Sequence, residues 1–266
     1  MQTALDSHGM ADTALGAPLD LDEAQVAQFR RCGYTIARGA VGASDLATIE
    51  AWCGEVLALP EQSGRHWVYG EASLLAPGER IVSRIEKISP FHAGFQRLTE
   101  ALAVPAAHLL GEAAVLFKEK INFKLPGGDG FKPHQDSQAG WDRYADFYVS
   151  ALLSIDAATP ENGCLQIVEN YEHRGLFASW QPLGDDDLAG MRMVDLPTEP
   201  GDVVFFDSFV PHGSQPNRTG DARRIYYATY NRASAGDHMA QYYADKHASY
   251  PPDIDRVADK EYVFRV

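Results

Sequence analysis

Residues 147–155 read FYVSALLSI, a short run of buried-type residues that predicts a β-strand. Similar runs, apolar or partly alternating, recur on both sides of it, and turn signals such as PGGDG at 126–130, ENG at 161–163 and PGD at 200–202 separate them. Many short strands without helices between them predict a mainly β fold of the jelly-roll or barrel type, not an α/β sheet. The other expected strands are 114–125, 164–168, 203–206 and 225–230.

The segment before this β region, about residues 20–112, predicts helices that flank the sheets. Apolar residues recur there at helical spacing, and we interpret them as stripes that face the core. The expected helices are one capped by Asp22 and closed by Gly33, one capped by Ser44 and stopped by Pro60, and one that carries Phe95, Leu98 and Leu102 and breaks at Pro105.

The length of 266 residues fits a single β-rich domain of roughly 200–250 residues with added helices. No stretch of about 18 apolar residues is present, so a membrane span is not expected. The expected organisation is a loose N-terminal tail at 1–16 and one domain at 17–266, whose β core at about 113–232 precedes a C-terminal extension at 233–266.

The net charge of −14 disfavours nucleic acid and anionic membranes as partners. Neither Lys nor Arg precedes Arg30, so a secretory signal is not expected. Cys32, Cys53 and Cys164 have no metal-ligand spacing and form no even set for disulfides. We interpret them as free thiols of a cytoplasmic protein. None of these observations indicates an oligomeric state.

The sharpest chemical feature is His134-Gln135-Asp136. Residues two apart in a strand point to the same face, so this imidazole and this carboxylate can meet at one point. His212, 76 residues after Asp136, follows the strand expected at 203–206 and is the candidate for a third ligand. Two histidines and one carboxylate on one face are the pattern of Fe(II) oxygenases. The tripeptide alone is weak evidence, because His-x-Asp is common and the chain has nine histidines.

Arg223 lies eleven residues past His212, where a new strand is expected to open after a loop. Such a hairpin can return the guanidinium group to the metal, and this group suits a carboxylate held by two hydrogen bonds. Ser214 could donate its hydroxyl to the same carboxylate. Since neighbouring strand residues face opposite ways, only one of Arg223 and Arg224 can point inward. The alternative is that Arg223 is an exposed charge at a sheet edge.

Five motifs follow one another between residues 118 and 231, and they are specific only as an ordered set. They are INFKLP at 121–126, PHQD at 133–136, ENGCL at 161–165, PGD at 200–202 and the segment 212–223. With these motifs the chain resembles the phytanoyl-CoA dioxygenase (PhyH) family of Fe(II)/2-oxoglutarate-dependent oxygenases, in the form of its bacterial small-molecule hydroxylases.

The resemblance implies a double-stranded β-helix, the cupin-like form of the jelly roll. It also implies that Fe(II), 2-oxoglutarate and O₂ take part in the reaction. The residues that it implicates are His134, Asp136 and His212 as iron ligands, Arg223 and Ser214 at the distal carboxylate of 2-oxoglutarate, Asn122 and Lys118 as further contacts of 2-oxoglutarate, and Gln135 as a support behind the ligands.

The implied reaction is hydroxylation of a C–H bond in a small polar metabolite, with release of succinate and CO₂. In one place the chain departs from the family. Some members carry a tryptophan that packs on the cofactor, where this chain reads Ala151-Leu152-Leu153. The carboxylate of Asp136 is present, whereas related halogenases lack it, so halogenation is disfavoured.

Arg84, Glu86 and Lys87 form a mixed-charge run before the β core. They would suit a zwitterionic substrate such as an amino acid or an aminophosphonate, although a solvated strand face would read the same way. The C-terminal segment 238–256 is faintly similar to hydroxylases of the same family, including those that act on 2-aminoethylphosphonate. These residues indicate a small-molecule substrate without identifying it.

Three aromatic residues, Trp141, Tyr144 and Phe177, are candidates to close over the site. They could equally be ordinary loop anchors. The segments expected to form the walls of a substrate pocket are 66–87, 137–146 and 175–193.

Two other functions stay open at this point. One is a cupin-like metal enzyme that does not use 2-oxoglutarate, which would leave Arg223 and Ser214 without a role. The other is a non-catalytic jelly-roll module that only binds metal, and the intact set of three ligands argues against it. Dependence of O₂ consumption on 2-oxoglutarate separates the first alternative from an oxygenase, and decarboxylation of 2-oxoglutarate separates the second.

Overall fold

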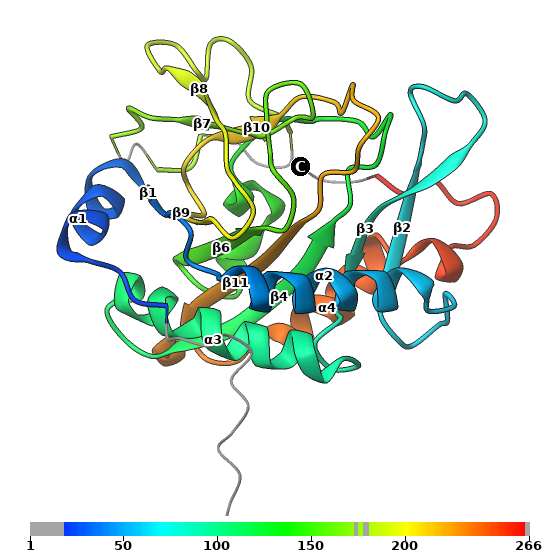
Figure 1. Cartoon of the computed structure of the whole chain (residues 1–266), viewed down its shortest axis with the longest axis horizontal. Helices are drawn as coiled ribbons and strands as arrows, with labels where there is room; N and C mark the ends of the chain where they lie inside the picture. The colour runs from blue at the N-terminus through cyan, green and yellow to red at the C-terminus, as the bar shows by residue number, and fades with distance from the viewer. Residues whose placement is uncertain (1–18, 173–174, 178–180, 264–266) are drawn as a thin grey trace, which may run out of the picture.

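The computed structural model describes residues 19–172, 175–177 and 181–263, and the expected tail at 1–16 lies outside them. Two antiparallel sheets face each other, and helices cover the outer side of the larger one (Figure 1). In spatial order the major sheet consists of β1 (Tyr34–Ala37), β9 (Val203–Asp207), β6 (Tyr148–Ser154), β11 (Ile225–Arg232), β4 (Ala114–Asn122), β3 (Arg80–Glu86) and β2 (Trp67–Ala72). The minor sheet consists of β5 (Phe131–His134), β10 (His212–Ser214), β7 (Leu165–Val168) and β8 (Met193–Leu196). The prediction of a mainly β jelly roll with flanking helices is confirmed.

The five expected strands occur as β4, β6, β7, β9 and β11, with ends that differ by a few residues. The segment at 20–112 is not only helical, because it also contributes β1, β2 and β3 to the major sheet, and this part of the prediction was wrong. The hairpin of β2 and β3 lies at the sheet edge, and each strand is buried over only about half its length. Its mixed polar sequence therefore lacks the apolar run that marks a central strand.

The first two helices show how well capping signals locate helix ends. Asp22 and Gly33 close the first helix as predicted, and the second ends before Pro60. The expected cap at Ser44 was wrong, because the second helix begins after Gly42 and Ser44 lies inside its first turn. The helices are α1 (Glu23–Cys32), α2 (Ala43–Ala58), α3 (Ala93–Leu110) and α4 (Met239–Ser249).

Helix α3 continues through Pro105, where the sequence predicts a break, so that prediction was also wrong. A proline inside a helix removes one backbone hydrogen bond and crowds the preceding turn. Pro105 is buried, however, and so are Ala106 and Leu110 beyond it. Their burial against the major sheet offsets the lost bond, because tertiary packing of an apolar face supplies most of a helix's stability.

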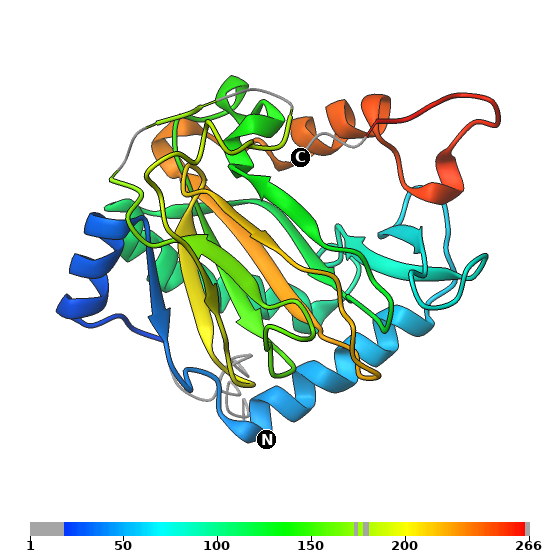
Figure 2. The ribbon, with the colours of Figure 1, turned by 90° about the horizontal axis from the view of Figure 1, so that it is seen from above.

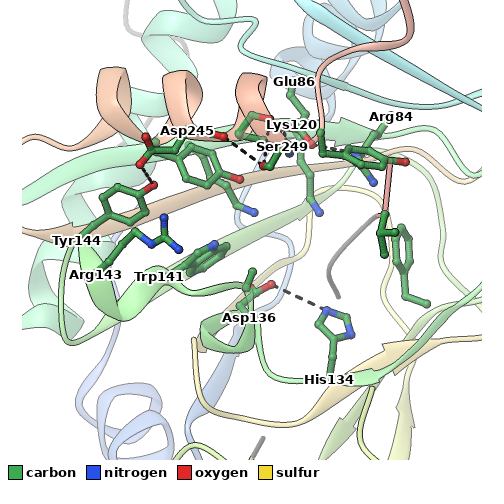
Figure 3. A pocket seen from close by; sticks show the side chains of 17 residues that line it. Arg84, Glu86, Lys120, His134, Asp136, Trp141, Arg143, Tyr144, Asp245 and Ser249 are labelled. Carbon is green, nitrogen blue, oxygen red and sulfur yellow. Dashed lines mark hydrogen bonds and ion pairs between the residues drawn. The ribbon is translucent and has the colours of Figure 1, made fainter. Parts of the chain in front are cut away.

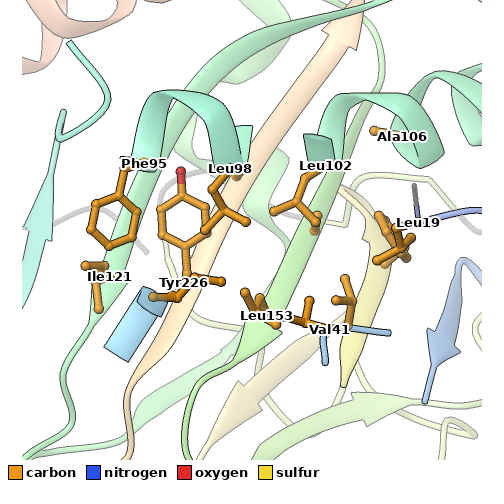
Figure 4. Close-up of a cluster of buried hydrophobic side chains, with 14 of the residues drawn as sticks. Leu19, Val41, Phe95, Leu98, Leu102, Ala106, Ile121, Leu153 and Tyr226 are labelled. Atoms are coloured by element: carbon orange, nitrogen blue, oxygen red, sulfur yellow. The ribbon is translucent and has the colours of Figure 1, made fainter. Parts of the chain in front are cut away.

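The principal core lies between α3 and the major sheet (Figure 4). Phe95, Leu98 and Leu102 of α3 project toward Ile121 of β4 and Tyr226 of β11, and all five side chains are almost fully buried. The opposite face of the major sheet turns toward the minor sheet. Helix packing thus fixes which side of each strand is left for a site between the two sheets.

Alternation along β4 places polar side chains on that inner face. Ile121 packs toward α3, whereas Lys118, Lys120 and Asn122 line the space between the sheets. Successive side chains of a strand point to opposite faces, so one strand supplies both the core and the polar wall.

Helix α4 closes one end of the space between the sheets. It follows β11 and packs against β4 (Figure 2). Of the helices described here, none has the length and apolar character needed to cross a membrane. The 3₁₀ helices are η1 (Asp136–Ala139), η2 (Trp141–Arg143), η3 (Ala233–Ala235) and η4 (Asp253–Asp255).

Candidate active site

His134 and His212 face each other across neighbouring strands of the minor sheet. His134 is the last residue of β5, His212 is the first residue of β10, and the two are direct partners in the antiparallel ladder. Their ring centroids are 4.3 Å apart, and Phe206 packs against the ring of His212. Strand pairing therefore brings together two residues that are far apart in the sequence.

Asp136 reaches the same point, although not from a strand. Strand β5 ends at His134, and η1 begins at Asp136. Gln135 between them keeps an extended backbone, with φ −109° and ψ 132°, so the expected alternation persists for one residue beyond the strand. The Asp136 carboxylate oxygen lies 3.9 Å from Nε2 of His134 and 4.0 Å from Nε2 of His212.

Each imidazole is oriented by a backbone carbonyl. Nδ1 of His134 lies 2.7 Å from the oxygen of Lys132, and Nδ1 of His212 lies 3.0 Å from the oxygen of Val210. A carbonyl can only accept, so Nδ1 carries the hydrogen and Nε2 keeps its lone pair. Burial, followed by the neighbouring His212, lowers the pKa of His134 to about 3, and burial also lowers the pKa of His212. Both imidazole rings are thus neutral, and each can offer the lone pair of Nε2 to a metal.

This donor set fits a divalent first-row metal. The ligand atoms of His134, Asp136 and His212 all lie within 4.8 Å of one another. Burial opposes ionisation of Asp136, but His212 and Lys118 outweigh it and lower the pKa of this carboxyl. Two imidazole nitrogens and one carboxylate oxygen on one side of a metal leave its other positions open, as non-haem iron oxygenases require.

A small cavity between the two sheets, here called the inner cavity, adjoins the metal ligands. Arg223, which precedes β11, lines it and is only 1% exposed. Arg224 points the opposite way and pairs with Asp156 at 2.7 Å and Glu50 at 2.6 Å. One of the adjacent arginines is therefore inward and the other outward, as the alternation argument predicts. The inner cavity is also lined by Lys118, Lys120, Asn122, Ser214 and Tyr227.

A second cavity, of about 210 Å³ and here called the outer cavity, is also lined by His134 and Asp136 (Figure 3). Lys118 and Lys120 line both cavities. Glu86 Oε2 accepts a bond from Lys246 of α4 at 2.5 Å, and Arg84 Nε lies 2.8 Å from Oε1 of the same carboxylate. The wall shared by β3, β4 and α4 thus carries four cationic side chains around one carboxylate.

Burial shapes the charges of this wall. Burial would raise the pKa of Glu86, but Lys246 and Arg84 outweigh it and bring the pKa down to about 2. Burial lowers the pKa of Lys246 to about 7, and burial together with Lys118 does the same for Lys120. Buried ammonium groups with lowered pKa values are stabilised when an anion binds beside them.

The part of the outer cavity around Tyr144 is aromatic and carries the carboxylate of Asp245 and the guanidinium group of Arg143. The Tyr144 hydroxyl donates to Asp245 at 2.6 Å, and Tyr242 lies on the same helix as Asp245. Trp141 is 1% exposed, and its Nε1 has no hydrogen-bond partner among the described residues. Lys118 Nζ lies 4.2 Å from the centroid of the Trp141 ring. This part of the cavity offers a carboxylate, an indole donor and aromatic faces.

The structure separates the sequence-based substrate candidates into two groups. Arg84, Glu86, Trp141 and Tyr144 line the outer cavity. Lys87 does not, because it follows inward-facing Glu86 and its ammonium group lies 5.7 Å from the Trp67 ring. Its proposed role in the pocket was therefore wrong.

Phe177 also departs from its predicted place over the site. It packs against the second hydrophobic cluster, with its ring 6.2 Å from that of Tyr171. It lines neither cavity. The alternative that it anchors a loop describes it better than closure over the site.

Sequence reasoning missed several residues of the outer cavity. Lys120 could have been found, because alternation between Lys118 and Asn122 puts it on their face. The residues of α4 carry a weaker signal, a helical spacing of three, four and seven positions that places one face on the cavity. They are Tyr242, Asp245, Lys246 and Ser249.

Gln135 acts behind the metal ligands and not at them. It is fully buried, and its amide nitrogen donates to the carbonyls of Phe209 at 2.6 Å and Gly175 at 2.7 Å. Its amide oxygen accepts from the backbone of Phe177 at 2.9 Å. Gln135 thus ties two loops to the segment between the two ligands.

Gln135→Ala is expected to lower the free energy of unfolding by about 2–3 kcal/mol, because a buried side chain loses three hydrogen bonds to partly buried backbone groups. Urea denaturation measures the change. The control is Gln166→Ala, at an exposed hydrogen bond to Asp195, where less than about 1 kcal/mol is expected. Equal effects of the two substitutions would show that Gln135 does not hold these loops.

Known proteins are similar to this chain in sequence and in structure. The family model described as "Phytanoyl-CoA dioxygenase (PhyH)" matches residues 29–225. A 2-aminoethylphosphonate dioxygenase from the uncultured bacterium HF130_AEPn_1 is 34% identical over 90% of this chain and 92% of its own length. A methylphosphonate hydroxylase from Gimesia maris is 35% identical over 86% of this chain and 88% of its own length.

Among solved structures, EctD from S. alaskensis with 2-oxoglutarate and 5-hydroxyectoine has a TM-score of 0.70 at 23% identity. The match covers 88% of each chain. At this level of identity the likeness establishes the shared fold.

Proposed function

The chain belongs to the phytanoyl-CoA dioxygenase family and is an iron- and 2-oxoglutarate-dependent dioxygenase, and from this premise we propose that it hydroxylates a small zwitterionic phosphonate such as 2-aminoethylphosphonate. The observation that carries the proposal is the cationic wall of the outer cavity, which lies directly beside the candidate metal ligands. The two relatives named for phosphonate substrates support it.

The cationic wall suits a dianionic head group. Lys118, Lys120 and Lys246 stand with Arg84 around the single carboxylate of Glu86. A phosphonate brings up to two negative charges and three acceptor oxygens, and charge-assisted bonds are the strongest that buried ammonium groups can make. A carboxylate substrate would supply less charge and fewer acceptors.

The part of the outer cavity around Tyr144 suits an ammonium group. Asp245 supplies a carboxylate there, next to the Tyr144 hydroxyl, whereas the Trp141 and Tyr242 rings already lie beside Lys118 of the cationic wall. A substrate bound between the cationic wall and Asp245 would lie across the cavity, with its carbon chain beside Asp136. This orientation presents a C–H bond to the metal face.

In this proposal His134, Asp136 and His212 hold the iron, and Arg223 holds the distal carboxylate of 2-oxoglutarate in the inner cavity. Oxidation of a C–H bond, with consumption of O₂ and release of succinate and CO₂, is the chemistry that iron and 2-oxoglutarate supply when bound. The protein's own side chains bind and orient the substrate and 2-oxoglutarate, and they exclude water. The family membership argues against a cupin-like enzyme without 2-oxoglutarate and against a non-catalytic module.

A substrate panel tests the proposal. We would measure succinate release by the iron-loaded enzyme with 2-aminoethylphosphonate, methylphosphonate, β-alanine and glycine. The strongest stimulation is expected from 2-aminoethylphosphonate, and β-alanine, its carboxylate analogue, should be a poor substrate. Preference for β-alanine would contradict the proposal of a phosphonate substrate. If no amine-containing acid stimulates succinate release, the proposal of a zwitterionic substrate is contradicted.

Asp245→Asn is expected to raise KM for 2-aminoethylphosphonate about threefold or more, because the substrate loses its carboxylate partner at a position where solvent weakens the contact. Inhibition by methylphosphonate, which has no ammonium group, should change less than about twofold. Steady-state kinetics measures both. The matched control is Asp185→Asn at an exposed position away from both cavities. Parallel losses for the two phosphonates would place the ammonium group elsewhere.

A further inference from the structure

We propose that Lys124 is a positioning residue for 2-oxoglutarate, and that its ammonium group makes the Ser214 hydroxyl a donor to the distal carboxylate of this co-substrate. The inference rests on the proposed function for the roles of Ser214 and Arg223. It assigns a task to a buried lysine that neither the metal ligands nor the cationic wall uses.

The hydrogen-bond geometry around Lys124 determines the direction of the Ser214 hydroxyl. Lys124 is 3% exposed, and its Nζ lies 2.7 Å from Ser214 Oγ and 2.6 Å from the carbonyl oxygen of Gln215. In its ammonium form Lys124 has donors and no acceptor, so Ser214 Oγ accepts from it. The single hydrogen of the hydroxyl is then free for another acceptor.

That hydrogen can point into the inner cavity. Ser214 lines this cavity together with Arg223 and Tyr227. Nε of Arg223 has no hydrogen-bond partner among the described residues. Ser214 and Arg223 therefore present two donors to the same space, which is the arrangement that a carboxylate with two oxygens requires.

Hydrogen bonds hold Lys124 in place beside both Ser214 and Arg223. Its backbone carbonyl accepts from the backbone nitrogen of Arg223 at 3.2 Å and from the side-chain amide of Asn217 at 2.9 Å. Asn217 is 1% exposed and also binds the carbonyl of Asp221, so it shapes the turn between Ser214 and Arg223. One residue thus fixes the start of the turn through its side chain and the end of the turn through its backbone.

Gly163 permits this close packing. Its φ is +77°, and a Cβ atom there would collide with the Gln215 carbonyl and lie 3.0 Å from Lys124 Nζ. The glycine of the ENGCL motif therefore leaves room for the contact between Lys124 and the segment that carries Ser214.

Charge supports the same role. Burial, followed by Arg223, lowers the pKa of Lys124 to about 7, while Glu71 and Asp129 act in the opposite direction. Two buried cationic groups near one cavity repel each other, and a bound dicarboxylate relieves that repulsion. Lys124 therefore favours an anion in the inner cavity in addition to directing the hydroxyl.

The test is a double-mutant cycle on binding, with no turnover involved. We would titrate the Mn(II)-loaded enzyme with 2-oxoglutarate by calorimetry for the parent, Lys124→Met, Ser214→Ala and the double variant. Lys124→Met should weaken 2-oxoglutarate binding about tenfold or more, since a charge-assisted network is lost. Ser214→Ala should weaken binding similarly in the parent but by less than about twofold in the Lys124→Met background.

Additive losses would overturn the inference, because they would show that Lys124 and Ser214 act independently. Pyruvate, which lacks the distal carboxylate, gives a second readout, and its affinity should be the same in the parent and in Lys124→Met. An equal loss for pyruvate would indicate a merely structural role. If Lys124→Met does not fold, Lys124→Gln enters the same cycle with the same criteria. A parent enzyme that binds no 2-oxoglutarate would contradict the proposed function itself.

Discussion

His212→Ala abolishes metal-dependent turnover, with an expected loss of about 1000-fold or more, since even residues that only support metal ligands cost 10- to 100-fold when removed. The substitution leaves His134 and Asp136 as a pair, and two ligands do not hold a catalytic metal firmly. The measurement is succinate release at fixed Fe(II), together with calorimetric Mn(II) binding, which separates loss of metal from loss of chemistry.

The control for this variant is His108→Ala, at an exposed histidine near the end of α3. It should keep metal affinity and turnover near the parent values. Normal succinate production by His212→Ala would remove this residue from the metal site and, with it, the role assigned to the pairing of β5 and β10.

Arg223→Ala raises the concentration of 2-oxoglutarate needed for half-maximal turnover by about 30- to 1000-fold. Loss of a charge-assisted, two-bond contact to a carboxylate costs on the order of 2–4 kcal/mol, and each 1.4 kcal/mol is tenfold in affinity. Arg223 is almost fully buried in the inner cavity, so solvent does not weaken this contact. Turnover as a function of 2-oxoglutarate concentration measures the effect.

Arg224→Ala is the matched comparison, because it removes the same side chain one position away. Its ion pairs with Asp156 and Glu50 lie outside both cavities. Arg224→Ala should therefore alter stability and leave the requirement for 2-oxoglutarate within about twofold of the parent. The reverse pattern would mean that the inward and outward arginines have been exchanged.

The local parts of the site were predictable from the sequence. His134 and Asp136 project together because an extended residue between them preserves alternation, even though the strand itself ends early. Arg223 and Arg224 divide inward and outward for the same reason. In each case a period of two positions decides which side chains share a face, and that period is visible in the sequence.

Of the long-range parts, His212 was predicted as the third ligand, but the strand pairing that places it and the cationic wall were not. β10 has only three residues, too few to recognise as a strand, yet its pairing with β5 sets His212 opposite His134. The cationic wall joins Lys246 of α4 to Glu86 of β3, which are 160 positions apart. The pairing register of distant strands depends on the packing of the whole chain, and it cannot be read from the local sequence pattern.

The errors at Lys87 and Pro105 have distinct physical causes. The mixed-charge run was assigned to the pocket as a group, but strand β3 ends at Glu86, and only Arg84 and Glu86 line the cavity. The break expected at Pro105 ignored the burial of the residues beyond it, which holds α3 together. Both errors arose because a local sequence pattern was interpreted without the surface against which the segment packs.

The central claim is that His134, Asp136 and His212 meet at one iron ion. Crystals grown without oxygen in the presence of Fe(II) and 2-oxoglutarate, measured at the iron absorption edge, would test it directly. The account predicts one anomalous peak within coordination distance of Nε2 of both histidines and of the Asp136 carboxylate, with Arg223 at the far end of the 2-oxoglutarate density. A peak that lacks any of the three ligands, or an iron bound elsewhere on the chain, would contradict it.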